Sequence, residues 1–580
     1  MKYSTIASAQ TIILHCKAKG IKNIVISPGS RNAPLTISFT ENPFFNCYSI
    51  VDERSAAFFA VGMAQQLKEP VVVVCTSGSA LLNYYPAIAE AYYSGIPLVI
   101  LSADRPSYKI DIGDGQTIRQ TNVFSNHIGY SANLKQDANH ASEIYNAHAL
   151  NKGDCKNIQE TIQAYNDSEL NTALNTAKHL KLPVHINVPF EEPLYDKVSN
   201  ASVVPNIVFE QNVNVKSNFN IEDFKEKWSS AERIMVLVGV NAPNVIDQEL
   251  LDMLGGDSRI IVFTETTSNL HHPNFFPSID SILAPIEKSE KKIELFKNLH
   301  PEILVTFGGL VVSKKIKAFL RSFKPEEHWH LDKLKALDTY FSLSKHIKEK
   351  PSIFLKSLVK LKNNKSNYYN FWNKKRDQYQ LKREEYLEKI PFSDFKVFDI
   401  ILKSIPDEYL LQLANSSTVR YTQLFNNNKT IPVFCNRGTS GIDGSVSTAV
   451  GASISNLTPT LLITGDLSFF YDSNGLWNNY LKKDFKIIVV NNAGGGIFRI
   501  LPGKEESKNF NTFFETQNNL SAKEICKLHN LDYLKAEDEY SLEEQLRKMY
   551  KTTEKPTLLE IKTPRLINDK ILIDYFDFIS

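Results

Sequence analysis

Cysteine is scarce in this sequence, and long apolar runs are missing. The six cysteines are scattered and form no C-x-x-C pair. We therefore expect buried free thiols in a reducing compartment rather than a disulfide framework or a zinc site. No apolar stretch approaches the length that spans a bilayer, and residues 11–14 are too short and too polar in their surroundings for a signal peptide. We expect a cytoplasmic protein that does not enter a membrane.

An excess of charge of one sign is also missing. The formal net charge is +2, with 42% hydrophobic and 22% charged residues. Such a chain has no global field for capturing nucleic acid or a membrane surface, so its basic residues matter only where they are locally placed. Neither a G-x-G-x-x-G turn opening a helix nor a G-x-x-x-x-G-K-[ST] loop occurs, which argues against a nucleotide-binding module.

Short apolar runs recur along the chain, each followed by a turn and a helix-like stretch, as at 24–26, 71–75 and 98–101. Strands that are apolar throughout and alternate with helices predict an α/β fold of parallel sheets flanked by helices. The pattern appears in three blocks, and 580 residues are too many for one core. The expected domains are 1–198, 199–350 and 391–580, with a helical connector at 351–390.

The strongest motif lies in the last block. Gly465-Asp466-Leu467-Ser468 directly follows the run 461–464, and Asn492 directly follows another apolar run. Adjacent parallel strands would bring Asp466 and Asn492 to the same sheet edge, where ligands bind. A carboxylate, an amide oxygen and a backbone carbonyl suit a hard divalent cation that keeps positions open for phosphate oxygens. The alternative is a pair of polar turns, because Asp and Asn are common turn residues.

These two segments resemble the signature of thiamine-diphosphate-dependent enzymes, Gly-Asp-Gly followed later by Asn-Asn. The resemblance implies that Asp466, Asn492 and the carbonyl of Gly494 hold Mg²⁺ or Mn²⁺. Leu467 departs from the pattern, since the family has glycine there. The cofactor-binding residues implied in this block are Gly465, Asp466, Leu467, Ser468, Asn492 and Gly494.

An acidic residue, Glu53, opens an Ala-rich apolar stretch in the first block. Thiamine chemistry needs a carboxylate against N1′ of the aminopyrimidine, and this segment resembles the family's glutamate segment, which implies that Glu53 is the activator. An acid that simply favours a helix N-terminus is the alternative. Thr76, Ser77 and Gly78 match positions that contact the pyrimidine in relatives.

The order of the blocks resembles the acetolactate-synthase-like branch of the family. It implies a pyrimidine-binding domain, a middle Rossmann-like scaffold and a diphosphate-binding domain. In that branch the glutamate and the diphosphate motif come from different subunits, which implies a homodimer or homotetramer with active sites at the subunit interface.

Basic residues stand in the loops that follow several predicted strands. Guanidinium groups bind carboxylates bidentately, and two dicarboxylic substrates would need more such groups than pyruvate does. Taken singly, each is more often a structural ion pair or a solvated side chain. The arginines in question are Arg31, Arg105, Arg119, Arg420 and Arg437.

These arginines and the sequence of the segments at 28–31, 103–106, 116–120 and 436–444 together resemble the corresponding segments of the synthases of menaquinone biosynthesis. The resemblance implies thiamine-dependent decarboxylation of 2-oxoglutarate and 1,4-addition of the succinyl carbanion to isochorismate, without elimination of pyruvate. Another thiamine-dependent 2-oxo acid decarboxylase or acetolactate-type carboligase is the alternative, and a catalytically dead paralogue is a further one.

The same resemblance implies a role for individual residues. The succinyl carboxylate lies near Ser416, Arg420 and Arg437, and isochorismate near Arg31, Arg105 and Gln116, with Ser30 in the same turn as Arg31. Ile442 bends the cofactor, and Ile497, Phe498 and Leu501 form apolar walls. Lys314 and Lys315 match a basic pair that reaches the second substrate, with Lys315 in place of arginine and Gly496 in place of a larger polar residue. His271 and His272 fall in the middle block, and we interpret them as structural.

Overall fold

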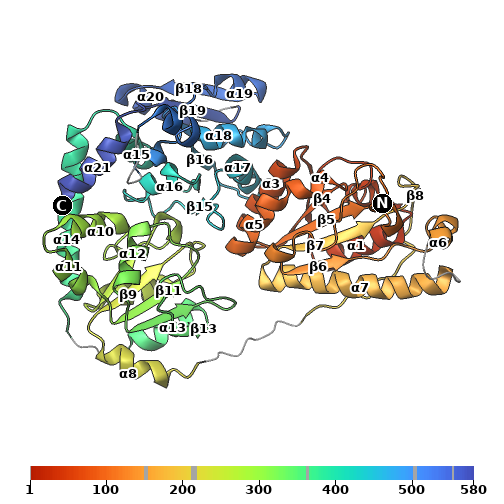
Figure 1. The fold of residues 1–580 in the computed structure, drawn as a ribbon, viewed down its shortest axis with the longest axis horizontal. Helices are drawn as coiled ribbons and strands as arrows, with labels where there is room; N and C mark the ends of the chain where they lie inside the picture. Colours follow the sequence, from red (N-terminus) through yellow and green to blue (C-terminus); the bar gives the residue numbers. More distant parts are fainter. Residues whose placement is uncertain (1, 149–154, 211–218, 361–364, 501–505, 552–553) are drawn as a thin grey trace. The chain divides into compact units, whose positions relative to one another are not determined.

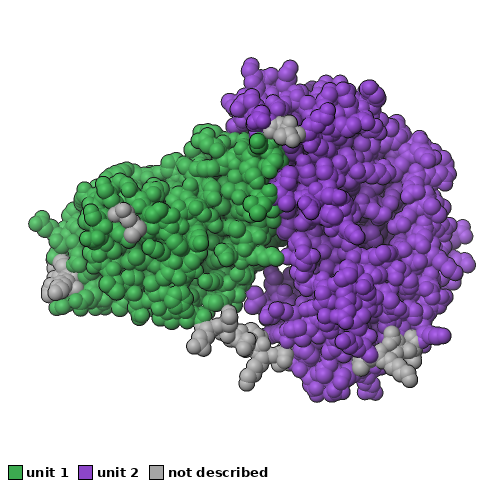
Figure 2. All heavy atoms as spheres, turned by 180° about the vertical axis from the view of Figure 1, so that it is seen from behind, with its two compact units in different colours: residues 1–213, 438–457, 471–485 green, residues 214–437, 458–470, 486–580 purple. Residues whose placement is uncertain are grey.

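The computed structural model describes the chain except residues 1, 149–154, 211–218, 361–364, 501–505 and 552–553. It contains three parallel sheets flanked by helices and one short antiparallel pair, β1 (Tyr3–Ser4) with β8 (Lys197–Val198), so the predicted α/β fold class is confirmed (Figure 1). The described residues form two compact units, coloured in Figure 2: unit 1 holds residues 1–213, 438–457 and 471–485, and unit 2 holds 214–437, 458–470 and 486–580.

Unit 1 is built on a six-stranded sheet with the order β3-β2-β4-β5-β7-β6. Its strands pair in parallel, and the four inner strands are almost entirely buried, as expected for a sheet covered on both faces. The strands are β2 (Asn23–Ile26), β3 (Asn46–Ser49), β4 (Val71–Cys75), β5 (Leu98–Asp104), β6 (Tyr130–Asn133) and β7 (Val184–Pro189).

Helices cover both faces of this sheet. One hydrophobic cluster joins the sheet to α1 (Ala7–Ala18) and α7 (Cys155–Leu180), which runs along the sheet in Figure 1. The opposite face contacts α3 (Glu53–Leu67), which also packs against α5 (Tyr85–Ser94). The remaining helices here are α2 (Ala33–Thr40), α4 (Ser79–Asn83) and α6 (Ser142–His148). Among the described side chains, Cys16, Cys75, Cys435 and Cys526 are buried, Cys47 is half-buried, and none of the five forms a disulfide; the side chain of Cys155 lies outside the described part.

The later segment α17 (Ser445–Ile454) also belongs to unit 1 and packs against α3. Two glycines make this close approach possible. A Cβ on Gly62 would lie 2.0 Å from the carbonyl oxygen of Thr448, and one on Gly451 would lie 1.9 Å from that of Phe59. Only glycine fits at such a crossing, so the backbones of α3 and α17 pack directly against each other.

Unit 2 contains two sheets. The first has the order β10-β9-β11-β12-β13 and pairs in parallel. Its strands are β9 (Ile234–Val238), β10 (Ile260–Phe263), β11 (Ile303–Phe307), β12 (Glu327–Leu331) and β13 (Lys345–Ile347), and its helices are α8 (Glu222–Ser230), α9 (Gln248–Gly256), α10 (Ile279–Lys288), α11 (Lys292–Leu299), α12 (Lys314–Ser322) and α13 (Pro351–Val359).

The second sheet of unit 2 has the order β15-β14-β16-β17-β19-β18. Its strands are β14 (Leu410–Leu413), β15 (Val433–Cys435), β16 (Thr460–Gly465), β17 (Phe485–Asn491), β18 (Asp532–Ala536) and β19 (Thr557–Lys562). Its helices are α15 (Asp394–Ser404), α16 (Ser417–Thr422), α18 (Asp466–Tyr471), α19 (Lys523–Leu528), α20 (Glu539–Met549) and α21 (Asn568–Ile579). Because β16 and β17 are neighbours, the residues that follow them share one edge.

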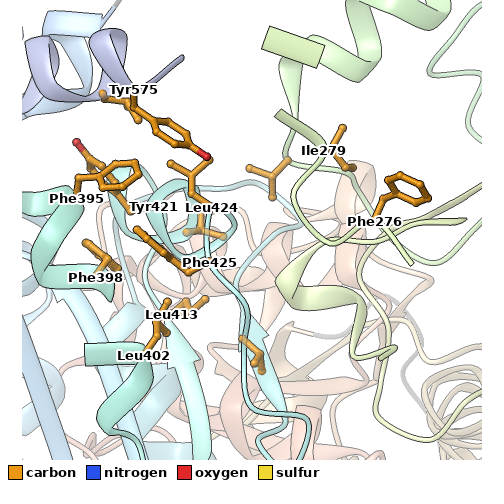
Figure 3. Packing of buried hydrophobic residues seen from close by; sticks show 14 of the residues in the cluster. Phe276, Ile279, Phe395, Phe398, Leu402, Leu413, Tyr421, Leu424, Phe425 and Tyr575 are labelled. Atoms are coloured by element: carbon orange, nitrogen blue, oxygen red, sulfur yellow. The ribbon is translucent and has the colours of Figure 1, made fainter. Parts of the chain in front are cut away.

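Aromatic packing joins the helices around this second sheet (Figure 3). The ring centroids of Phe395 and Tyr575 lie 4.6 Å apart, and those of Phe398 and Tyr421 are stacked at 5.3 Å. The long helix α14 (Tyr368–Lys389), within the predicted helical connector, contributes Tyr386 to the same cluster. Within the described part of the chain, no helix combines the length and the apolar character that crossing a membrane requires.

Candidate active site

Asp466 and Asn492 lie at the edge where β16 and β17 end. Asp466 is the first residue of α18, directly after β16, and Asn492 directly follows β17; their side chains are 3% and 9% exposed. The Asp466 carboxylate accepts hydrogen bonds from the Leu467 backbone N–H at 2.8 Å and from Asn518 Nδ2 at 3.2 Å. The sequence motif therefore meets at one sheet edge, as its spacing predicted.

Only one of the two polar atoms of the Asn492 side chain has a hydrogen-bond partner among the described residues. Its Nδ2 donates to Asp394 Oδ2 at 2.9 Å, which turns the amide oxygen the other way. That Oδ1 atom is buried and has no hydrogen-bond partner among the described residues. Burying an acceptor without a partner costs free energy. A metal ion bound by this oxygen would supply the missing partner. The donor set of Asp466, Asn492 Oδ1 and the Gly494 carbonyl therefore fits a hard divalent cation.

Electrostatics at this edge favour the same ligand. The pKa of Asp466 is raised to about 6, mainly by burial and to a smaller extent by the Asp394 carboxylate, against the hydrogen bonds from the Leu467 N–H, Asn518 and the Gly494 N–H. Burial also raises the pKa of Asp394. Two buried carboxylates repel each other in the ionised form, so a divalent cation would offset a cost that this edge otherwise carries.

The loop after Asn492 is held by a buried ion-pair network. Gly494 has a φ of +151°, and a Cβ there would lie 2.9 Å from the Glu515 carbonyl oxygen. The Glu515 carboxylate binds Arg499 Nε at 2.7 Å and Arg565 NH1 at 2.6 Å, and its backbone carbonyl accepts from Gly495 N. The half-buried Ile497 and Phe498 lie in this loop; Leu501 lies outside the described residues.

A second group of predicted residues gathers in unit 2 beyond β14 and β15. Ser416 has a φ of +66° and precedes α16, which carries Arg420. Arg437 follows β15 and donates from NH1 to Asn415 Oδ1 at 2.6 Å, while Asn415 Nδ2 donates to the Asn436 carbonyl. Burial lowers the pKa of Arg420, whose guanidinium group interacts with the buried carboxylates of Asp280 and Glu265. The Arg437 guanidinium group interacts with Glu265.

The two lysines at the start of α12 differ in environment. Lys314 is exposed, and Lys315 forms an ion pair with Glu287 of α10 and lies over the Phe576 ring. This pair gives Lys315 a structural partner and leaves it partly buried, whereas Lys314 is exposed. Gly496, the other departure from the resemblance, has Asn492 Nδ2 3.2 Å from where its Cβ would lie, so a larger residue there would press on Asn492.

In unit 1 the predicted residues after β4 and β5 lie together. Ser77 Oγ and Arg105 NH1 both donate to the Gln116 carbonyl, at 3.0 and 2.9 Å. The Gly78 N–H donates to Gln120 Oε1 at 2.9 Å. Thr76 and Ser77 are buried. The strand-end loops thus bring the pyrimidine-contact and second-substrate candidates of this unit into one cluster.

The other predicted basic residues of unit 1 separate into two kinds. Arg31 is 6% exposed and donates to the Phe190 carbonyl and Glu192 Oε1, while its buried Nε has no partner among the described residues; Ser30 beside it is exposed. Arg119, by contrast, has a side chain 83% exposed and paired with Asp111. The structure does not bring Arg119 together with the Arg105 cluster.

Glu53 is half-buried and opens α3, after Asp52, whose side chain accepts from the Ser55 N–H at 3.1 Å. Ile442 is 38% exposed in the loop before α17. That loop has an anchor that the sequence did not reveal: the buried Glu90 carboxylate accepts from the Gly438 and Thr439 N–H groups, both at 2.7 Å. All of these contacts are within unit 1.

Sequence reasoning also missed Asp394, Asn518 and Glu515. Asp394 stands at the start of α15 and looks like an ordinary helix-opening acid, and no local pattern links it to Asn492. For the histidine pair, His272 interacts with Asp252 at 3.4 Å and accepts from the Asn274 N–H, and burial lowers the pKa of His271. These contacts agree with a structural interpretation.

Comparison with known proteins places these sites in a family. Two family models match the chain, "Thiamine pyrophosphate enzyme, N-terminal TPP binding domain" over residues 7–128 and "Thiamine pyrophosphate enzyme, C-terminal TPP binding domain" over residues 415–561. Asp466, Asn492 and Gly494 fall in the second match, and Glu53 falls in the first.

Curated relatives match over the full length. A 2-succinyl-5-enolpyruvyl-6-hydroxy-3-cyclohexene-1-carboxylate synthase of Christiangramia forsetii is 54% identical over 582 residues, covering 100% of both chains. Synthases of the same name from Flavobacterium johnsoniae and Porphyromonas gingivalis are 52% and 37% identical, with 99% and 97% of this chain and 99% and 95% of theirs covered. The chain therefore belongs to the 2-succinyl-5-enolpyruvyl-6-hydroxy-3-cyclohexene-1-carboxylate synthase family of thiamine-pyrophosphate enzymes.

Proposed function

We propose that this enzyme decarboxylates 2-oxoglutarate and adds the succinyl unit 1,4 to isochorismate, giving 2-succinyl-5-enolpyruvyl-6-hydroxy-3-cyclohexene-1-carboxylate for menaquinone biosynthesis. Thiamine diphosphate and Mg²⁺ or Mn²⁺ are its cofactors. The observation that carries the proposal is the unsatisfied, buried Asn492 Oδ1 beside Asp466, in a chain related over its full length to such synthases.

Asp466, Asn492 and the Gly494 carbonyl hold the cation, and Gly465, Leu467 and Ser468 border the diphosphate. When bound, thiamine diphosphate supplies the electron sink that makes loss of CO₂ from a 2-oxo acid possible. Asp394 orients the Asn492 amide for this task through its hydrogen bond to Nδ2. Outer partners of this kind fix the orientation of metal ligands.

The pyrimidine end is assigned to unit 1. Glu53 would hold a proton at the aminopyrimidine N1′, Thr76, Ser77 and Gly78 would be further contacts, and Ile442 would set the conformation of the bound cofactor. The glycine-mediated packing of α3 on α17 supports this assignment, because it joins the helix that Glu53 opens to the helix that follows the Ile442 loop.

Cationic groups recognise the carboxylates of both substrates. Ser416, Arg420 and Arg437 bind the succinyl carboxylate, since the two guanidinium groups share one partly buried environment. Isochorismate is bound by the remaining set, and apolar walls exclude water from the reacting carbon. The second-substrate residues are Ser30, Arg31, Arg105, Gln116 and Lys314, and the walls are Ile497, Phe498 and Leu501.

The assembly is a cytoplasmic homodimer or homotetramer with its active sites at the subunit interface, and its partners are small molecules rather than nucleic acid or membrane. Its pyrimidine-binding domain spans 1–198, the middle scaffold 199–350, the helical connector 351–390 and the diphosphate domain 391–580.

The direct test incubates the protein with thiamine diphosphate, Mg²⁺, 2-oxoglutarate and isochorismate and follows isochorismate loss together with product mass. Consumption should need both substrates and the cofactor and should vanish in Glu53→Gln. Glu69→Gln, an exposed glutamate just past the other end of α3, is the matched control and should behave as the wild type.

Two outcomes would contradict the proposal in different ways. Release of CO₂ from 2-oxoglutarate without isochorismate consumption would keep the thiamine chemistry but make the acceptor wrong. Failure to bind thiamine diphosphate at all would remove the whole proposal.

A further inference from the structure

A short loop in unit 2, Glu265–Asn269, contacts two separate elements: α12, which carries Lys314, and β15, which leads to Arg437. We refer to it as the 265–269 loop. At its first residue, the Glu265 carboxylate is 3% exposed and lies at the N-terminus of α12. The Val312 N–H donates to both of its oxygens, at 3.0 and 2.8 Å, and the Ser313 N–H donates to Oε1 at 2.8 Å. Glu265 therefore satisfies the free amides that precede the helix carrying Lys314.

The last residue of the loop binds a different element. Asn269 Oδ1 accepts from the Val433 N–H at 2.8 Å, and Asn269 Nδ2 donates to the Val433 carbonyl at 2.9 Å. The same Nδ2 donates to the Asn241 carbonyl. Val433 opens β15, which leads directly to Arg437. One side chain thus pairs with both backbone groups of the residue that starts this strand.

The loop between these two ends is itself anchored. Ser268 Oγ donates to the Val238 carbonyl at the end of β9, and the Glu265 N–H donates to Ser268 Oγ. Thr266 Oγ1 accepts from Asn427 Nδ2 at 3.1 Å. Because β9 is a buried central strand, the loop transmits the position of a rigid strand to both α12 and β15.

Charge links the loop to the same groups. The Glu265 carboxylate interacts with the Arg437 and Arg420 guanidinium groups and with the Lys317 ammonium of α12. A buried carboxylate among these cations offsets part of their mutual repulsion while leaving a net positive environment. The hydrogen bonds of the loop and the charge of Glu265 therefore both favour the observed positions of Arg437 and α12.

We propose that the 265–269 loop is a positioning element that keeps Arg437 and α12 in register for the carboxylates of the two substrates. Asn269 sets the strand that presents Arg437, and Glu265 sets the helix that presents Lys314. Neither loop residue contacts substrate. The substrate assignment rests on the function proposed above, whereas the contacts of the loop do not.

Asn269→Gly tests the β15 half. Asn269 has a φ of +51°, so glycine keeps the backbone conformation and removes the side-chain hydrogen bonds, namely the pairing with Val433 and the bond to the Asn241 carbonyl. The KM for 2-oxoglutarate should rise about tenfold or more, because small misplacements of a binding group are costly, while the KM for isochorismate changes little. Asn244→Gly is the matched control: it also has a positive φ, +61°, and is exposed.

Glu265→Gln tests the α12 half. The amide nitrogen cannot accept a backbone N–H, so one of the bonds from Val312 is lost. The KM for isochorismate should rise, with a smaller change for 2-oxoglutarate, which is the opposite pattern from Asn269→Gly. Glu265→Asp keeps an acceptor on both oxygens and should recover part of the loss.

Amide hydrogen exchange makes the outcomes decisive. Asn269→Gly should speed exchange in the peptide that contains Val433, and Glu265→Gln in the one that contains Val312 and Ser313. Equal losses in kcat/KM for both substrates, or unchanged exchange in both peptides, would overturn the proposal. If the wild type and Asn244→Gly do not join the two substrates, the proposed function fails instead, and the exchange data alone decide whether the loop holds the two elements.

Discussion

The two sheets of unit 2 present the same kind of edge and use it differently. In both, parallel strands end beside one another at a point where loops can meet, which is the usual location of ligand sites in α/β sheets. At the β9–β11 edge the loops bond to each other: the Gly309 N–H donates to the Val240 carbonyl at 2.7 Å, and a Cβ on Gly239 would lie 1.8 Å from the Gly309 carbonyl oxygen. At the β16–β17 edge a buried acceptor, Asn492 Oδ1, faces no protein donor among the described residues.

The difference shows that topology marks a location and the residues at it decide its chemistry. Glycines occur at both edges. Those after β9 and β11 allow two backbones to close on each other, whereas Gly494, after β17, allows a tight loop beside the ligand set. The closed loops of the β9–β11 edge agree with the absence of both phosphate-binding motifs from the sequence.

The largest expected effect comes from removing the charge at the open edge. Asp466→Asn keeps the shape of the side chain but loses the anionic metal ligand, so metal-dependent binding of thiamine diphosphate and product formation should fall by about a hundredfold or more. The metal-free variant should be at least as stable as the wild type, because a buried charge close to Asp394 has been removed. Titration calorimetry with Mg²⁺ and thermal unfolding would measure both effects.

Measuring cofactor binding and stability together tests two other interpretations, a turn-only role for Asp466 and general damage to the fold. If Asp466 were only a turn residue, Asn would serve equally well, and cofactor binding would survive the substitution. A variant that loses cofactor binding and also unfolds would instead indicate general damage to the β16–β17 edge.

A smaller effect is expected from the residue behind the ligand. Asp394→Ala removes the acceptor that fixes the Asn492 amide, so Mg²⁺ affinity should fall about tenfold to a hundredfold while the ligand set remains. Asp399→Asn is the matched control, because Asp399 lies on the same helix and pairs with Lys403. Equal Mg²⁺ affinity in the two variants would mean that Asp394 does not orient Asn492.

The pH dependence of metal binding sharpens the comparison further. The pKa of Asp466 is raised to about 6 in the folded protein from its usual 3.8, so the carboxyl stabilises the metal-free fold at low pH and that stability is lost as pH rises through 6. The cation must displace a proton below pH 6, and its affinity should therefore fall about tenfold per pH unit there. Stabilisation of the wild type by Mg²⁺, followed by thermal unfolding, should grow from pH 5 to pH 7.

Asp466→Asn should lack this particular pH response. A wild-type Mg²⁺ affinity that stays constant from pH 5 to pH 7 would show that Asp466 does not bind the cation as a carboxylate. Burial also raises the pKa of Asp472, in unit 1, to about 6, and the variant retains this residue. A pH response near 6 that stays in the variant therefore comes from groups such as Asp472 and not from Asp466.

Local pattern was enough to predict the fold class and the location of Asp466 and Asn492 at one sheet edge, because strand period, turn residues and parallel pairing are all local consequences of sequence. The roles of Ser77, Arg105 and Gln116 came from the family resemblance instead and stay predictions, although these residues contact one another in the structure. Partners distant along the chain could not be predicted in this way. Glu90 binds the backbone of residues 438 and 439 across most of the sequence, and nothing near Glu90 encodes that contact.

Surface charge was the other limit. Arg119 occupies a strand-end segment like Arg105, yet it pairs with Asp111, a neighbour only a short loop away, and Lys315 pairs with Glu287. A loop arginine and a site arginine have the same sequence signature. What distinguishes them is burial against the sheet, which depends on tertiary packing rather than on motif.

The smallest expected effect concerns the closed edge. Gly239→Ala forces a methyl group into the Gly309 carbonyl and should destabilise the protein by about 1–3 kcal/mol, as overpacking usually does. Gly256→Ala is the matched control, because a Cβ there meets nothing within 4 Å, and it should be neutral or slightly stabilising. Urea unfolding would measure both, and Mg²⁺-dependent cofactor affinity should be unchanged in each. A loss of cofactor affinity in Gly239→Ala would break the comparison, because the β9–β11 edge would then contribute to the site formed at the β16–β17 edge.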